Sequence, residues 1–90
     1  MKRTLYTVCV LWDDADNESD AWAETFADAE SAGAYARDEK NDAIRNLFGR
    51  LEEGDDYMME EHESPSRIEI MDHFSSRYCC ITRTEQEIEV

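Results

Sequence analysis

The stretch that decides the fold is RTLYTVCVLW, residues 3–12. It is rich in β-branched and aromatic residues, which predicts a β-strand. Because side chains alternate along a strand, apolar residues reach both faces: Leu5, Cys9 and Leu11 on one face, and Tyr6, Val8, Val10 and Trp12 on the other. Since both faces are apolar, we expect a central strand that is covered on both sides.

A loop, a strand and a helix are expected to follow. Residues 13–20 are too polar for a regular element, whereas residues 22–26 alternate and predict a short strand antiparallel to the first. A helix is expected at about 28–48, because Asp28 is a good N-cap and small apolar residues recur at steps of three and four. Gly49 or Gly54 would end it.

The second half of the chain predicts further strands. Residues 67–74 and 78–84 alternate, with a turn at 75–76, and residues 85–90 either extend the last strand or fray. Residues 57–61 predict a short strand or a single helical turn. The sequence therefore predicts one α+β domain spanning 1–90, with the order β-β-α-β-β. A small antiparallel sheet of about four strands would carry one long helix on a face.

Charge excludes several classes of partner. The chain has 90 residues, with 23 acids against nine Lys and Arg, and a net charge of −14. It would repel nucleic acid phosphates and anionic membranes. The sequence has no apolar run long enough for a transmembrane helix and no signal-peptide cleavage pattern. We therefore expect a cytoplasmic protein, in the host cytoplasm if it is phage-encoded.

The excess negative charge lies in two blocks, residues 13–30 and 51–63, which hold eight and seven acids and no base. The remaining residues are nearly neutral, which argues against an evenly acidic, salt-adapted protein. The low lysine content keeps that interpretation open, and either block could simply be a solvated loop. The candidate partner-binding residues are twelve block acids and one tyrosine: Asp13, Asp14, Asp16, Glu18, Asp20, Glu24, Glu52, Glu53, Asp55, Asp56, Glu60, Glu61 and Tyr57.

Neither catalysis nor a cofactor or metal site is predicted. The three cysteines are odd in number and form no C-x-x-C pair, so buried thiols are expected rather than disulfides or zinc ligands. A calcium loop starting at Asp14 would need glycine and glutamate where Ser19 and Thr25 stand. No nucleophile motif or phosphate-binding glycine loop is present. The sequence therefore favours a binding protein over an enzyme.

A resemblance narrows the kind of partner. A small acidic chain that begins with a strand and continues F-x-D-A-E-S-A-x-x-Y-A, residues 26–36, resembles short phage-encoded anti-CRISPR and anti-restriction proteins, several of which mimic nucleic acids. The resemblance implies a target in bacterial defence machinery. We therefore expect a non-enzymatic inhibitor that presents carboxylates to the basic nucleic-acid-binding surface of a CRISPR effector or restriction enzyme. Exposed aromatics such as Trp22 or Tyr57 could anchor it.

One alternative is a small adaptor that binds through an apolar sheet or helix face, with the acids serving solubility or salt adaptation. An exposed edge strand would also allow a homodimer.

Overall fold

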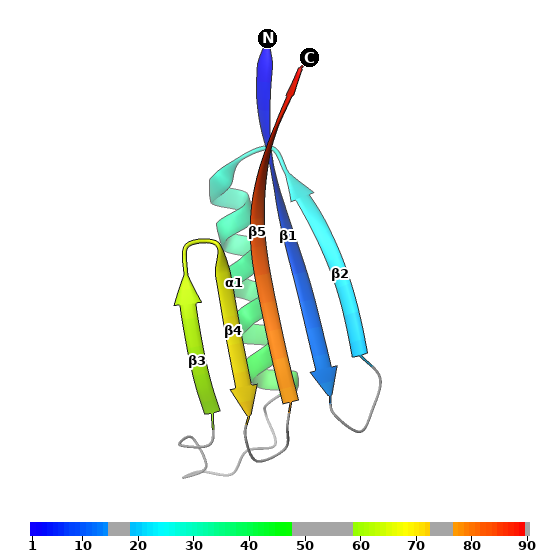
Figure 1. Cartoon of the computed structure of the whole chain (residues 1–90), viewed down its shortest axis with the longest axis vertical. Helices are drawn as coiled ribbons and strands as arrows, with labels where there is room; N and C mark the ends of the chain where they lie inside the picture. Colours follow the sequence, from blue (N-terminus) through cyan, green and yellow to red (C-terminus); the bar gives the residue numbers. More distant parts are fainter. Residues whose placement is uncertain (15–18, 48–58, 73–76, 90) are drawn as a thin grey trace.

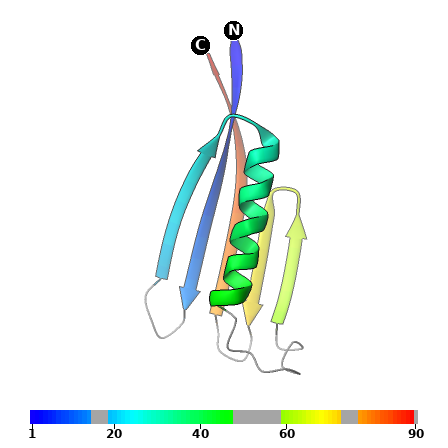
Figure 2. The ribbon, with the colours of Figure 1, turned by 180° about the vertical axis from the view of Figure 1, so that it is seen from behind.

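The computed structural model describes residues 1–14, 19–47, 59–72 and 77–89. Five antiparallel strands form one sheet in the order β2-β1-β5-β4-β3, and one helix crosses a single face of it (Figures 1 and 2). The elements are, in chain order, β1 (Lys2–Asp14), β2 (Ser19–Phe26), α1 (Ala29–Asn46), β3 (Met59–Ser64), β4 (Arg67–Asp72) and β5 (Arg77–Glu89).

The sheet is built around the long pair β1 and β5. These strands align over 13 residues each, from Lys2 opposite Glu89 to Asp14 opposite Arg77. The two chain ends therefore lie side by side (Figure 1). Strand β2 pairs with the other edge of β1, so the apolar stretch 3–12 lies inside the sheet.

Helix α1 begins where its N-cap residue satisfies the first free backbone donors. The carboxylate of Asp28 accepts hydrogen bonds from the backbone N–H of Ser31 at 2.7 Å and from its hydroxyl at 2.9 Å. These bonds lower the pKa of Asp28. Beyond the cap, Ala32, Ala36 and Ala43 are buried, and their small side chains let the helix lie close to the sheet.

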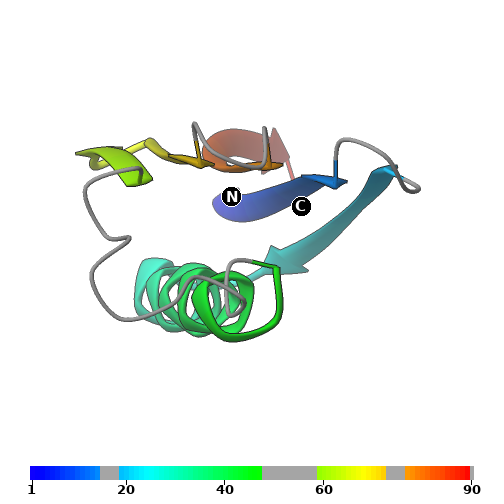
Figure 3. The ribbon, with the colours of Figure 1, turned by 90° about the horizontal axis from the view of Figure 1, so that it is seen from below.

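The core lies between α1 and the sheet (Figure 3). The helix contacts β1, β5 and β2. The largest fully buried side chains are Ile70, Ile81, Val8, Val10 and Cys79. Half-buried aromatic residues pack around this cluster. Apolar burial is the main source of stability in a domain of this size.

The structure confirms an α+β fold with one helix on an antiparallel sheet, but the order along the chain is β-β-α-β-β-β, one strand more than the predicted β-β-α-β-β. Residues 59–64 form β3, where the sequence predicted a short strand or helical turn at 57–61. This polar strand has no apolar alternation, and it forms because a two-residue turn at Pro65 and Ser66 pairs it with β4. Residues 85–89 extend β5 because the start of β1 pairs with them. The expected turn at 75–76 and the glycine stops lie outside the described residues.

A second correction concerns the faces of β1. We expected cover on both sides, but within the described residues α1 covers only one (Figure 3). Val8 and Val10, which face the helix, are 0% and 1% exposed, whereas Leu11 on the opposite face is 38% exposed. Cys79 and Cys80 are buried as expected, but Cys9 is exposed.

The core assignment predicts a contrast between two isoleucines. Ile70→Ala empties a fully buried position and should lower the free energy of unfolding by about 2–4 kcal/mol. Ile44→Ala on the outer side of α1, at 36% exposed, should cost less than about 1 kcal/mol. Urea denaturation measures both, and equal losses would contradict the described core.

Candidate functional site

The candidate site lies where edge strand β2 meets α1. The register places Glu24 opposite Val8 and Trp22 opposite Val10. Both residues therefore share the face of β1 that the helix covers, because paired residues point to the same side of a sheet. Helix α1 contacts β2, so side chains of the two elements meet along this side.

Aromatic contacts fix the floor of the site. The indole N–H of Trp22 donates to the hydroxyl of Tyr35 at 3.1 Å. Trp22 also packs edge-on against Trp12, with ring centroids 5.5 Å apart, and Phe26 lies 5.2 Å from Tyr35. Trp22 is thus half-buried and held in place. In turn, the hydroxyl of Tyr35 donates to the carboxylate of Glu39, one helical turn further on.

The charges of three other carboxylates act on Glu39, and we call the four residues the acidic cluster: Glu24, Asp38, Glu39 and Asp42. The pKa of Glu39 is raised, first by its partial burial and then by the negative charges of the other three. The hydrogen bond from Tyr35 acts in the opposite direction. Burial and the neighbouring charges therefore both disfavour the ionised form of Glu39 in the folded state, and Arg45, 3.5 Å from Asp42, offsets part of the negative charge.

The two acidic blocks of the sequence did not include most of this cluster, and helical spacing explains why. Residues 31–50 contain acids and bases in similar number, so they counted as neutral. Tyr35, Asp38, Glu39 and Asp42 are separated by steps of three and four, which puts them on one flank of α1. Arg37 and Lys40 fall outside that flank. A helical projection would have separated the two signs.

Only part of the predicted binding set falls within the described residues. Seven members lie outside them: Asp16, Glu18, Glu52, Glu53, Asp55, Asp56 and Tyr57. Of the first block, Glu24 belongs to the acidic cluster, and Asp20 occupies the same face of β2, opposite Trp12.

Other members of the predicted set are placed differently. Asp13 lies on the opposite face and accepts a hydrogen bond from Ser19 at 3.2 Å. Asp14 forms an ion pair with Arg77 at 2.9 Å. The pairing register places Glu60 opposite Met71. The structure thus does not gather the described acids of the first block on one surface.

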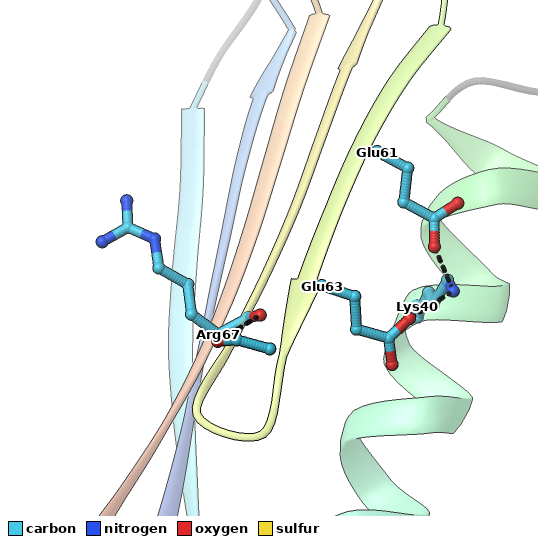
Figure 4. A network of polar contacts seen from close by, with 5 residues as sticks. Lys40, Glu61, Glu63 and Arg67 are labelled. Atoms are coloured by element: carbon cyan, nitrogen blue, oxygen red, sulfur yellow. Dashed lines mark hydrogen bonds and ion pairs between the residues drawn. The ribbon is translucent and has the colours of Figure 1, made fainter.

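The acids of β3 whose side chains the structure describes form ion pairs with α1. Glu61 forms an ion pair with Lys40, and Glu63 contacts the same ammonium at 3.2 Å (Figure 4). The hydrogen bond to Glu61 is the largest cause of a raised pKa at Lys40. Arg67, on the adjoining strand, points its guanidinium away from this group (Figure 4). Glu61 and Glu63 therefore tie edge strand β3 to α1.

Reactive groups give no further site. Burial raises the pKa of the Cys79 thiol to about 12, with Cys80 and Glu39 contributing, so it stays protonated at neutral pH. Within residues 1–14, 19–47, 59–72 and 77–89, no three His, Cys, Asp or Glu side chains are grouped to hold a metal ion. In the same part of the chain, no helix is long and apolar enough to cross a membrane.

Comparison with protein-family models, curated proteins and solved structures gives no significant match.

The tie between β3 and α1 can be tested through Lys40. Lys40→Met should lower the free energy of unfolding by about 0.5–1 kcal/mol, because the pair is partly exposed, and should speed amide exchange in β3. Arg37→Met, which removes an exposed positive charge from the same helix, is the control. Because the pKa of Lys40 is raised, its contribution is complete below 10.5 and disappears as the pH rises through the folded value. Equal effects of the two substitutions would contradict the tie.

The acidic cluster predicts a stabilising substitution. Glu39→Gln removes the central charge but keeps an acceptor for Tyr35, so the melting temperature at pH 7 should rise by roughly 2 °C. A raised folded pKa stabilises the protein below the usual 4.5 and loses that effect as the pH increases. The advantage of the variant should therefore vanish near pH 4. Glu85→Gln, an exposed acid on β5, changes the net charge equally and should have a smaller effect. Calorimetry that finds no difference between the two variants at pH 7 would refute the repulsive cluster.

Proposed function

We propose that this protein is a non-enzymatic inhibitor that binds the basic nucleic-acid-binding surface of a bacterial defence complex, such as a CRISPR effector or a restriction enzyme. The acidic cluster would occupy the positions of phosphates. Asp20 would extend this surface along β2.

The observation that carries the proposal is the placement of Glu24 of β2 on the side of the sheet that α1 covers, where its charge and those of Asp38 and Asp42 act on Glu39. A fold that served only solubility could space its acids apart and avoid this repulsion. Arginine or lysine side chains of a partner would remove it, so part of the binding free energy would come from relief of strain already present in the free protein. Destabilising charge arrangements of this kind are typical of functional sites.

Pre-organisation supports the same conclusion. Trp22 holds Tyr35, which interacts with Glu39, and Asp42 accepts hydrogen bonds from Asn46 at 2.7 Å and from Arg45 at 3.5 Å. Less conformational entropy would therefore be lost when Glu39 and Asp42 bind a partner. Carboxylates also bind arginine through short, charge-assisted hydrogen bonds. Carboxylates that are partly held in place would thus compete with a phosphate backbone for a basic cleft.

The alternative is an adaptor that binds through an uncharged face, and the two functions differ in their response to salt. An interface of carboxylates with arginine and lysine weakens as salt increases. An apolar interface keeps or gains affinity under the same conditions.

Two variants of equal net charge test the proposal. The quadruple variant Glu24→Gln, Asp38→Asn, Glu39→Gln, Asp42→Asn neutralises the acidic cluster. The control Glu30→Gln, Glu85→Gln, Glu87→Gln, Glu89→Gln removes four exposed acids elsewhere. Because each variant neutralises four acids, each changes the net charge from −14 to −10. We expect the cluster variant to lose at least tenfold in affinity, about 1.4 kcal/mol, and the control to lose less than about threefold.

The readout is displacement of fluorescent guide or target nucleic acid from purified CRISPR effectors and restriction enzymes, measured at low and high salt. Protection of phage in cells that carry the same systems gives a second readout. Equal weakening by both variants would show that binding depends only on net charge and not on the acidic cluster. Salt-insensitive binding that survives neutralisation of the cluster would favour the adaptor.

A further inference from the structure

The face of the sheet away from α1 carries a strip of mostly apolar residues that no described helix or strand covers. Two cross-strand rows define it: Ala23, Cys9 and Thr82, and beside them Ala21, Leu11 and Cys80. These six residues, which we call the open face, line a shallow hollow of about 540 Å³. No described element lies over it (Figure 3).

Leu11 marks this strip as unusual for the surface of a small domain. It is 38% exposed in the middle of the sheet, next to the exposed thiol of Cys9. Its neighbours across the strands are small, so the strip is flat enough for another sheet to approach. Contiguous apolar surface that is not needed for the core is a mark of an interface.

The charges around the strip differ from those of the rest of the protein. By the pairing register, the acids and arginines on this side of the strands are Arg3, Asp13, Glu60, Arg67 and Glu69, and His62 lies among them. With His62 neutral their sum is −1, whereas the whole chain carries −14. Arg67 and Glu69 form an ion pair with each other. Arg3 and Asp13 stand near opposite ends of β1.

We infer that the open face binds a second copy of this chain, sheet against sheet, with the two β1 strands antiparallel. A two-fold axis between the sheets and perpendicular to β1 would bring Arg3 of each copy towards Asp13 of the other. A parallel arrangement would oppose like charges. This nearly neutral face is also where two strongly acidic copies meet with least repulsion, because the acidic clusters then point away from each other.

The available area fits a modest dimer. Taken over all five strands, about 4.8 Å apart and with about eight residues each at about 3.3 Å, this side of the sheet has roughly 600 Å². Two whole sides in contact would bury roughly 1,200 Å², at the lower limit for a stable interface. We therefore expect a weak dimer that forms at high protein concentration. Face-to-face sheets pack about 10 Å apart, a distance that small residues such as Ala21 and Ala23 allow.

Sedimentation velocity over a range of concentrations tests this inference with a matched pair of variants. Leu11→Glu and Ile44→Glu add the same charge at positions of 38% and 36% exposure, one on the open face and one on the helix. We expect wild type and Ile44→Glu to dimerise with similar constants and Leu11→Glu to weaken the dimer at least tenfold. A wild-type monomer at all concentrations, or equal weakening by both variants, would overturn the inference.

A charge swap tests the orientation. Arg3→Glu and Asp13→Arg should each weaken the dimer, and the double variant should recover most of the loss because the pair is restored in reverse. Alkylation of Cys9 should also slow as protein concentration rises. A dimer that persists in Leu11→Glu with Cys9 reactive would place the contact elsewhere on the protein and refute the open face. These outcomes do not depend on the acidic cluster, so the proposed function can fail or hold separately.

Discussion

Strand β1 is paired along both edges, by β2 and by β5, and a single helix covers one of its faces. Because side chains alternate along a strand, this arrangement decides which chemistry reaches which side of the protein. Val8 and Val10 enter the core, and Leu11 and Cys9 stay outside it. The same alternation passes through the pairing register to β2, where Glu24 joins the helix side and Ala23 the open side.

The two sides therefore differ in charge as well as in apolar area. On the helix side, Glu24 from the edge strand meets carboxylates from one flank of α1, around a Glu39 that Tyr35 and Trp22 hold in position. The open side is close to neutral. If both proposals hold, the anionic surface would bind a cationic partner and the nearly neutral surface a second copy of the chain, without competition between them. The ion pairs of Lys40 with β3 use other acids to support the sheet.

Local patterns in the sequence predicted the elements with strong signals. The alternation of residues 3–12, the Asp28 cap and the alanine spacing of the helix were sufficient for the α+β class. The sequence did not predict strand β3 clearly, because the strand is stabilised by pairing with β4 and by Lys40 and not by apolar alternation. The acidic cluster could not be found by counting charge along the chain, because it joins Glu24 to residues more than ten positions away. Asp13 and Asp14 are adjacent in the sequence but point to opposite faces, because successive residues of a strand alternate between the two sides of the sheet.

The most direct test of the account is the titration of the Glu39 carboxyl carbon by nuclear magnetic resonance in the free protein at low salt. The account predicts a pKa above the usual 4.5, which falls towards that value when salt is added or when Asp38 and Asp42 are neutralised. A Glu39 that titrates at or below 4.5, unaffected by salt and by its neighbours, would contradict a fixed group of mutually repelling carboxylates.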